Sequence, residues 1–382
     1  MKKILFTATV SQSHIKVFHI PYLKWFKEQG YEVHVASRGD NNVPFCDEFF
    51  ELPFERSPLK LNNLITYGKL KKIIDKNNYE LIHCHTPMGG VLTRIAARKA
   101  RKKGTKVIYT AHGFHFFKGA SNLNWKLYFP MEKWLSRYTD CLITINQEDY
   151  EAAIENDFKA KQIEFIKGVG IDLDRFTPQN DEVKRKLRRE YGYKDNDLIL
   201  MYAAELSHRK HQDLLINVVS KLKNKFPNIK LLLAGTGDLE LQYKKQVENL
   251  DLNTNVDFLG YRKDINKLML LADIAVSSSR QEGLPVNIME AMATGLPLVV
   301  TDCRGNRDLV TDGENGFIIE LNDINSFVQS LEKLAKSSAL RKSFGEKSLE
   351  LTKEYCLEVI KEQMASIYAL NCKSIRHIDQ ES

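Results

Sequence analysis

The sequence has no long apolar run and few cysteines. It contains no stretch of about 18 consecutive apolar residues, so nothing in it resembles a membrane-spanning helix, and the opening "MKKILFTATV" is too short for one. The six cysteines are scattered without a CxxC pair, which excludes a disulfide framework and predicts reduced, mostly buried thiols. We therefore expect a cytoplasmic protein.

Compositional bias is also absent. Of the 382 residues, 43% are hydrophobic and 27% charged, which excludes a disordered or fibrous chain and suggests two packed domains. The net charge of +7 comes from the first half, since residues 1–178 hold 27 Lys and Arg against 19 Asp and Glu, whereas residues 179–382 hold 29 against 30. A basic first half indicates an anionic partner: a phosphate-bearing ligand, a nucleic acid or an acidic membrane surface.

Short apolar or β-branched runs alternate with helix-length segments along both halves of the chain. The runs are 3–9, 32–37, 80–85, 106–112, 141–146 and 163–168, then 198–205, 229–235, 256–260, 274–278, 297–302 and 316–320. This alternation predicts an α/β protein of two Rossmann-like, doubly wound domains that face each other across a ligand-binding cleft. We place the first domain at 1–178 and the second at 179–357, with a C-terminal helix at about 358–382 packing back on the first.

Two glutamates, Glu282 and Glu290, flank a Gly-Leu-Pro turn in "EGLPVNIMEAMATG". Pro285 suits a first helical turn and Gly295 a C-terminal cap, so a helix is predicted over about 285–294. Its unpaired amides would form an anion site for a diphosphate, and Glu290 would accept hydrogen bonds from ribose hydroxyls. The alternative is one solvated helix glutamate and one loop glutamate.

The Glu-x7-Glu spacing and the following "GLPLVVTDCRGNRDLVTDGENGFII" (295–319) closely resemble the retaining glycosyltransferases of family 4, which have the GT-B architecture. The resemblance covers nearly the whole chain, through "GVGIDLDRFTP" (168–178), "AGTGDLE" (234–240) and "FLGYRKD" (258–264). The first half, for example "YTAHGFHFFKGASNLNWKLYFP" (109–130), is similar to enzymes that build bacterial capsular and exopolysaccharides.

The resemblance implies roles for individual residues. Glu282 would approach the donor sugar, Glu290 would hold the ribose and Lys210 would bind the diphosphate. Many family members carry an arginine where this chain has Glu205, and Arg209 is the candidate to replace it. The remaining donor-binding candidates are Gly235, Gly283, Leu284 and Val286.

The first half supplies three further candidates. His112, in "YTAHGF", matches a family histidine that lies against the donor sugar, although a lone histidine is more often structural. The segment "TVSQSHIKVFH" (9–19) lacks the double glycine of many relatives, and its Ser13 and His14 are expected to bind the acceptor.

No metal or cofactor is expected. His83 and His85 point to the same side of one strand and provide two ligands, whereas zinc needs three or four. The Asp-x-Asp pairs at 172–174 and 195–197 both fall at the domain junction. In GT-B enzymes, helix amides and basic side chains generally neutralise the leaving diphosphate.

Basic residues at helical spacing in the first half suit an anionic membrane surface, with a solvated surface as the alternative. They are Arg94, Arg98, Arg101 and Lys102, and Lys69, Lys71 and Lys72 beside Leu64, Ile65 and Leu70, with Trp125, Phe129 and Trp134 nearby. No nucleic-acid-binding motif accompanies them.

These inferences predict a retaining hexosyl- or N-acetylhexosaminyltransferase (EC 2.4), peripheral on the inner face of the cell membrane. It would move a sugar from a UDP-sugar to an undecaprenyl-diphosphate-linked saccharide in capsular polysaccharide synthesis. N-acetylfucosamine, N-acetylgalactosamine and N-acetylglucosamine are the expected sugars. The alternatives are a UDP-sugar epimerase of the same fold and a non-catalytic nucleotide-sugar sensor.

Overall fold

A computed structural model describes residues 1–372 and divides the chain into two compact units. The first unit is Met1–Val169 together with the chain from Glu358, and the second is Gly170–Leu357. Residues 373–382, the end of the predicted C-terminal helix, lie outside the described residues.

The second unit begins several residues before the boundary expected from the sequence. Ile171 forms a parallel bridge with Cys356, and the Ile171 carbonyl accepts a hydrogen bond from the Leu357 amide at 2.9 Å. The Gln179 side chain then donates to the carbonyl of Ala272 at 2.7 Å. These contacts fasten residues 170–179 to the second unit.

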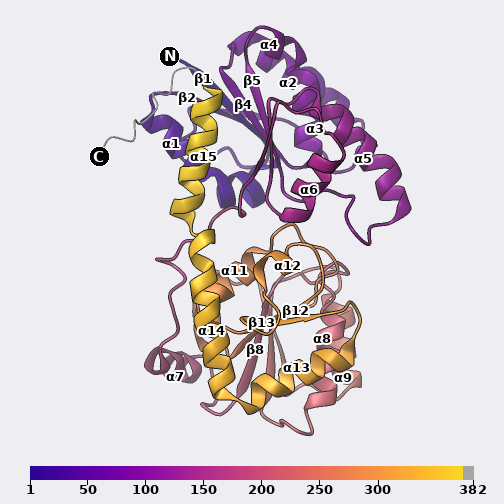
Figure 1. The fold of residues 1–382 in the computed structure, drawn as a ribbon, viewed down its shortest axis with the longest axis vertical. Coiled ribbons are helices and arrows are strands. Elements are labelled where there is room, and N and C mark those ends of the chain that lie inside the picture. The colour runs from indigo at the N-terminus through magenta and orange to yellow at the C-terminus, as the bar shows by residue number, and fades with distance from the viewer. Residues whose placement is uncertain (373–382) are drawn as a thin grey trace. The chain divides into compact units, whose positions relative to one another are not determined.

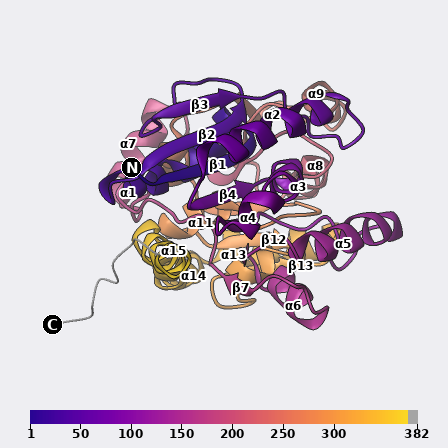
Figure 2. The same ribbon diagram turned by 90° about the horizontal axis from the view of Figure 1, so that it is seen from above.

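The sheet of the first unit has seven parallel strands in the order β3-β2-β1-β4-β5-β6-β7, and Figure 2 shows β3, β2, β1 and β4 in this sequence. The strands are β1 (Lys3–Val10), β2 (Glu32–Arg38), β3 (Glu48–Glu51), β4 (Leu81–His85), β5 (Lys106–Ala111), β6 (Cys141–Thr144) and β7 (Gln162–Phe165). All but β3 lie on predicted runs. β3 is a four-residue edge strand with no fully buried side chain, so its apolar pattern is too short to detect.

Helices cover both faces of this sheet (Figure 1). They are α1 (Ile20–Glu28), α2 (Asn62–Asn77), α3 (Pro87–Ala96), α4 (Arg98–Lys102), α5 (Asn122–Ser136), α6 (Gln147–Glu155) and α15 (Leu357–Asn371). On one face, α15 joins β1 and α1 in a single apolar core, where the Tyr368 ring lies 4.6 Å from that of Phe26. The C-terminal helix therefore completes the core of the first unit, as the sequence predicts.

The segment after β1 differs from the loop expected there. Ser11–His19 forms a π-helical segment, η1, that runs directly into α1. Its wide turns bury Ile15 and His19 against the sheet and leave Ser13 exposed. π-helical turns are rare and often mark functional sites, which is consistent with the acceptor role expected of this segment.

The second unit contains a six-stranded parallel sheet in the order β10-β9-β8-β11-β12-β13. Its strands are β8 (Leu198–Ala203), β9 (Ile229–Ala234), β10 (Val256–Gly260), β11 (Ile274–Ser277), β12 (Leu298–Thr301) and β13 (Gly316–Ile319). Its helices are α7 (Asp181–Glu190), α8 (Gln212–Leu222), α9 (Glu240–Asn249), α10 (Ile265–Leu271), α11 (Val286–Ala293), α12 (Asn306–Leu309), α13 (Ile324–Lys336) and α14 (Ser338–Thr352), followed by a 3₁₀ turn, η2 (Lys353–Tyr355). The two doubly wound parallel sheets confirm the predicted fold class.

The basic helical face predicted in the first unit is only partly formed. Arg94 is buried, donates to Glu132 Oε2 at 2.7 Å and lies over the Tyr109 ring at 3.9 Å, so it is an internal ion-pair residue. Arg101 Nε donates to Asp140 Oδ2 at 2.7 Å and ties α4 to β6. The prediction of four surface cations was wrong for these two, because helical spacing does not show which side faces the core.

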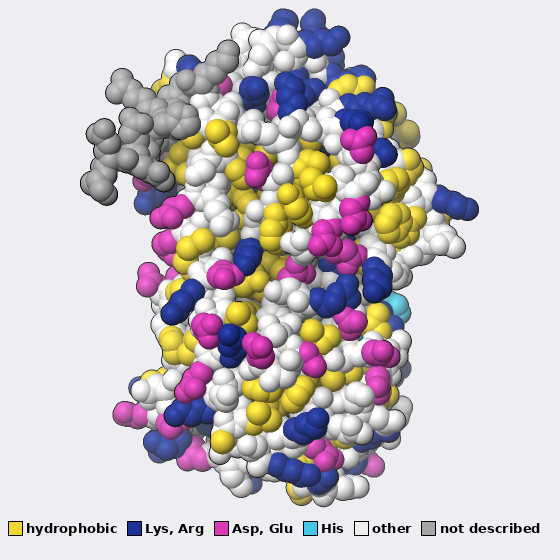
Figure 3. Space-filling view, in the orientation of Figure 1, with side chains coloured by type: hydrophobic (Ala, Val, Ile, Leu, Met, Phe, Trp, Pro, Cys, Tyr) yellow, Lys and Arg dark blue, Asp and Glu magenta, His cyan; other side chains and the backbone are white. Residues whose placement is uncertain are grey.

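A basic surface nevertheless remains at α4. Figure 3 shows Lys and Arg side chains gathered over the end of the first unit where α4 lies in Figure 1. The exposed residues are Arg98, Lys99, Lys102 and Lys103. Within residues 1–372, no helix combines the length and the apolar character needed to cross a bilayer, and all six cysteines are free thiols.

Candidate active site

The predicted donor residues of the second unit gather at the carboxyl ends of β8 and β11. These strands are neighbours in the sheet although they are far apart in the sequence, so the strand order reverses between them. In doubly wound sheets, ligands bind in the crevice at this switch point. Lys210 follows β8 and Glu282 follows β11, which brings the two side chains to the same crevice.

Lys210 is held by residues from both β8 and the end of β11. Its backbone carbonyl accepts hydrogen bonds from Ser278 Oγ at 2.9 Å and from the Tyr202 hydroxyl at 3.3 Å. Its side chain is buried, and the ammonium donates to Glu282 Oε1 at 2.5 Å. The cation is therefore positioned by the fold before any ligand arrives.

Glu282 is the anionic centre of this cluster. Ser279 Oγ donates to Oε1 at 2.5 Å, and Arg209 Nη1 approaches Oε2 at 3.3 Å. The backbone carbonyl of Glu282 accepts a hydrogen bond from Arg304 Nε at 2.9 Å. Both the side chain and the backbone of Glu282 are thus fixed, which sets the direction of the turn that follows.

The electrostatics of the cluster favour an anion. Burial would raise the pKa of Glu282, but the charges of Lys210 and Arg209 outweigh burial and hold this pKa below its ordinary value. Glu282 is therefore ionised at neutral pH. Two cations around one carboxylate leave a net positive charge beside the crevice. That Arg209 replaces the missing family arginine stays a prediction.

Helix α11 begins directly after this cluster. Pro285 is its N-cap residue, Val286 its first residue and Thr294 its C-cap, within one residue of the predicted ends. The first amides of a helix lack partners inside the helix, and the positive end of the helix dipole adds to their attraction for an anion. Gly283, buried Leu284 and Val286 therefore lie at a helix start that attracts anions, and their role in donor binding stays a prediction.

A close approach of two backbone segments holds this turn. Gly305 has φ of 82°, and a Cβ there would lie 2.5 Å from the Gly283 carbonyl oxygen and 3.1 Å from Pro285 Cδ. Only a glycine permits both the left-handed backbone and this contact.

We expect Gly305→Ala to lower the free energy of unfolding by about 1–3 kcal/mol and to displace the Glu282–Pro285 turn. Urea unfolding measures the first effect and donor binding the second. Gly313→Ala is the matched control, because Gly313 has φ of 78° and nothing within 4 Å of its added Cβ. If both variants lose the same stability, the contact with Gly283 contributes nothing.

Glu290 lies in the second turn of α11 and differs from Glu282 in its surroundings. Among residues 1–372, no side chain or amide forms a hydrogen bond with its carboxylate. Burial raises the pKa of Glu290 to about 7, and the charge of Arg175 offsets this only in part. A half-buried carboxyl group without a protein partner is suited to receive ligand hydroxyls.

Gly235 ends β9 next to the same crevice. Its φ is 152°, and an added Cβ would lie 2.0 Å from the Ala204 carbonyl oxygen. Its amide donates to the Gly260 carbonyl at 2.8 Å. Gly235 therefore lets the end of β9 pack against the loop after β8, a structural reason for glycine at this position.

The remaining predicted residues lie in the first unit. His112 follows β5, and its ring centroid is 4.5 Å from that of His14 in η1. Burial lowers the pKa of His112 to about 4, so its imidazole is neutral at neutral pH. Burial also lowers the pKa of His14. Neither imidazole therefore supplies a positive charge to a leaving group.

Ser13 and His14 line a cavity of about 420 Å³ in the first unit. Its walls come from η1, α3, α5 and the loop before α2, and most of them are apolar. Representative lining residues are Met88, Val91, Leu127, Tyr128 and Met131, with Arg56 at the loop. An apolar cavity with a few polar groups is the usual form of a small-molecule site.

Sequence reasoning missed the residues that brace the cluster. Ser279 is fully buried. Its hydroxyl oxygen accepts a hydrogen bond from the Tyr202 hydroxyl at 2.7 Å, and its carbonyl accepts one from Thr301 Oγ1 at 2.6 Å. Arg304, also buried, supports the Glu282 carbonyl. The sequence did contain one signal for these residues. The run Ser277–Ser279 ends an apolar strand, and hydroxyl groups buried there need hydrogen-bond partners.

Comparison with known proteins identifies the family of the chain. Residues 183–350 match the family described as glycosyl transferases group 1, and residues 3–146 match glycosyl transferase 4-like. The chain is 46% identical over 368 residues to the putative glycosyltransferase EpsD of Bacillus subtilis, covering 96% of each protein. It is 31% identical over 277 residues to the Escherichia coli UDP-Gal:alpha-D-GlcNAc-diphosphoundecaprenol alpha-1,3-galactosyltransferase, covering 71% of this chain and 70% of that protein.

The crystal structure of Anabaena Alr3699/HepE in complex with UDP-glucose has the same fold. Its TM-score is 0.78 at 20% identity, over 97% of this chain and 100% of that one. Two doubly wound parallel sheets of seven and six strands give the chain the GT-B architecture. The chain belongs to the group 1 glycosyltransferases, glycosyltransferase family 4.

Proposed function

We propose that this enzyme transfers a sugar, with retention of anomeric configuration, from a UDP-sugar to a saccharide linked to undecaprenyl diphosphate during capsular or exopolysaccharide synthesis. N-acetylated amino sugars are the first donors to test, as the sequence suggests. UDP-galactose is next, because the E. coli relative is named for that donor and for a diphosphoundecaprenol acceptor.

The observation that supports a nucleotide diphosphate donor is the arrangement around α11. A buried ammonium, a guanidinium and the first amides of the helix meet at one point, and the unbonded Glu290 carboxyl lies about one turn further along. A diphosphate fits the first group and a ribose diol fits the second. The UDP-glucose bound in Alr3699/HepE, which has the same fold, is consistent with this donor class.

The proposed mechanism uses the leaving diphosphate as the base. The acceptor hydroxyl attacks the anomeric carbon from the face that the diphosphate leaves, and its proton passes to a diphosphate oxygen. Lys210, Arg209 and the α11 amides stabilise the charge that develops there. Glu282 keeps these cations in place, and its remaining lone pairs accept a donor-sugar hydroxyl. The role of His112 against that sugar remains a prediction from the family resemblance.

The acceptor is assigned to the cavity beside η1. Ser13 and His14 provide polar groups at one wall, while the other walls are apolar, as a lipid-linked saccharide requires. Leu127, which lines the cavity, is 51% exposed, and Leu59, Leu61 and Leu64 near Arg56 are 70–90% exposed. Arg56 and Pro58, which come just before Leu59 in the chain, line the cavity. We call the four exposed leucines the apolar rim.

We propose that the apolar rim touches an anionic membrane. Exposed Arg56, Lys60 and Lys69 surround it, and charge attraction together with shallow apolar insertion is the usual mode of peripheral binding. Of the apolar residues predicted for this role, Ile65 is also exposed, whereas Leu70 is buried and Phe129 packs against the core.

Leu61→Asp combined with Leu64→Asp is expected to lower the affinity for phosphatidylglycerol-containing vesicles, measured by cosedimentation, by about 100-fold or more, since each leucine contributes roughly 1.5–3 kcal/mol when fully inserted. Leu241→Asp is the control, because Leu241 is 76% exposed but lies on α9 of the second unit. Equal losses in both variants would contradict a membrane contact at the rim.

The function is tested by incubating the enzyme with a panel of UDP-sugars and undecaprenyl-diphosphate-linked monosaccharides. Mass spectrometry should detect one acceptor extended by one sugar, and NMR should show the donor's anomeric configuration in the product. A changed sugar nucleotide in reactions without acceptor would indicate an epimerase instead. UDP binding without transfer to any acceptor would indicate a sensor.

A further inference from the structure

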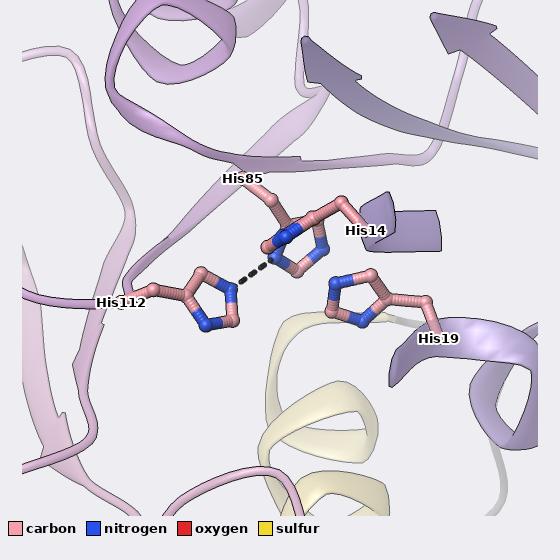
Figure 4. A group of neighbouring side chains, drawn as sticks. All are labelled: His14, His19, His85 and His112. Carbon is pink, nitrogen blue, oxygen red and sulfur yellow. Dashed lines mark hydrogen bonds between the residues drawn. The ribbon is translucent and has the colours of Figure 1, made fainter. Parts of the chain in front are cut away.

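Four histidines from three elements meet inside the first unit (Figure 4). His14 and His19 come from η1, His85 from the end of β4 and His112 from the residue after β5. One ring nitrogen of each lies within 4.8 Å of the chosen nitrogens of the other three. The rings of His19 and His85 stack with centroids 3.7 Å apart, and His14 is close to both His19 and His112.

Half of the ring nitrogens of this cluster are buried and lack partners. Within the part of the chain that the structure describes, His14 Nε2, both nitrogens of His19 and His85 Nε2 are buried without a hydrogen bond. A weak contact of 3.4 Å joins His85 Nδ1 to His112 Nε2. Buried polar atoms are nearly always satisfied, so several orphan nitrogens within one group of neighbouring rings indicate that something binds there.

Other buried histidines of the same unit show that this is not a general property of the fold. His83, two residues before His85 on β4, bonds the Tyr368 hydroxyl at 2.9 Å and Thr110 Oγ1 at 2.8 Å. His34 bonds the Tyr79 hydroxyl and Glu32 Oε1, both at 2.7 Å. The fold satisfies both nitrogens where a histidine is structural.

The chemistry of the four side chains selects the kind of ligand. Burial, reinforced by mutual repulsion, lowers the pKa of His14, His19 and His85, so their imidazoles are neutral and have lone pairs to offer. The cluster includes no carboxylate. Neutral nitrogen donors suit zinc, copper, nickel and iron, whereas magnesium and calcium require oxygen ligands.

We propose that His14, His19, His85 and His112 bind one divalent transition-metal ion of the zinc type. Metal–nitrogen bonds of about 2.0–2.1 Å place tetrahedral ligand atoms roughly 3.4 Å apart, so the rings need only to close inward slightly. A cavity of about 20 Å³ next to His19, His85 and His112 leaves room for this movement or for one water. The sequence-based argument against zinc considered His83 and His85 alone. The residue pattern of a single strand reveals the possible ligands on that strand but not those that other elements bring close in the fold.

The ion would fasten η1 to the ends of β4 and β5. Ser13 precedes one ligand directly, and both Ser13 and His14 line the cavity assigned to the acceptor. The metal would therefore order one wall of that cavity. The binding site itself does not depend on the proposed function, because all four ligands belong to the first unit and metal binding is measured without substrates.

The test uses the full chain without a histidine tag. After treatment with a chelator and dialysis, the protein is titrated with Zn²⁺ in competition with a chromophoric chelator, and bound metal is counted by plasma emission spectroscopy. We expect one Zn²⁺ per chain, a higher melting temperature with Zn²⁺, and a tetrahedral absorption spectrum when Co²⁺ replaces it.

His85→Ala and His14→Ala should each weaken Zn²⁺ binding at least tenfold. His14 is only half-buried, so its variant keeps the test valid if His85→Ala fails to fold. His34→Gln is the matched control, since it removes a buried imidazole of the same unit outside the cluster. The proposal is overturned if stripped wild-type protein binds no more Zn²⁺ than the His14→Ala variant, or if melting temperature and Co²⁺ spectrum show no response, as for a site that holds only water.

Discussion

Lys210→Met is expected to lower kcat for sugar transfer about 10²- to 10³-fold, the usual cost of removing one preorganised group that stabilises developing charge. The ammonium is buried and held at the start of α11, where the proposed diphosphate leaves. Methionine keeps most of the side-chain volume and removes the charge. UDP release, measured with the donor and acceptor found active, gives the rate.

A second variant separates catalysis from folding. Lys210→Met leaves the buried Glu282 carboxylate with Arg209 as its remaining cation, which itself lowers stability. Adding Glu282→Gln removes that unpaired charge, so the double variant should regain stability without regaining kcat. Recovery of the rate in the double variant would show that Lys210 acts only by neutralising Glu282. Lys245→Met, on the exposed side of α9, is the surface control.

Glu290→Gln should lower kcat/KM about 10- to 100-fold, since hydrogen bonds to a charged acceptor contribute roughly 1.5–3 kcal/mol. Because the pKa of Glu290 is raised to about 7, the carboxyl group is protonated below neutral pH and loses acceptor strength there. Donor affinity of the wild type should therefore rise as pH increases through about 7, and the glutamine variant should lack this dependence. Steady-state kinetics measure kcat/KM. Calorimetric titration of the wild type and of the glutamine variant with UDP, repeated across this pH range, measures the two affinities.

The raised pKa of Glu290 also makes the free energy of unfolding depend on pH. The folded carboxyl group binds its proton more tightly than the unfolded one, whose pKa is 4.5, so its contribution to stability is complete below 4.5 and is lost as pH rises to about 7. Glu290→Gln should remove that loss, whereas Glu248→Gln on the exposed surface should not. An unchanged pH dependence in the Glu290 variant would place the titrating group elsewhere.

The sequence was most informative where structure is local. Apolar runs located every strand except β3, and Pro285 with Gly295 located α11 within one residue at each end, because strand burial and helix capping depend on neighbours in the chain. Recognition of the Glu-x7-Glu spacing then brought Lys210 and Glu282 into one site, which helical and strand periodicity could not do.

Contacts between distant segments were not predictable in the same way. The burial of Arg94 depends on Glu132, which lies 38 residues further along the chain, and helical spacing alone cannot identify such a partner. The histidine cluster needs η1, β4 and β5 together, and η1 is a π-helical segment that no sequence pattern indicated. The loop interpretation of that segment concealed the proximity of His14 and His19 to His85.

The two ends of the second unit meet at one place. An added Cβ on Gly170 would lie 2.7 Å from the Cα of Leu357, and Ile171 pairs with Cys356 beside it. The second unit is therefore an insertion in the first, entering and leaving through adjacent residues, as inserted domains commonly do. Such an insert can be excised as one fragment, and the halves of the first unit can be rejoined by a short linker, because removal leaves no long gap to close.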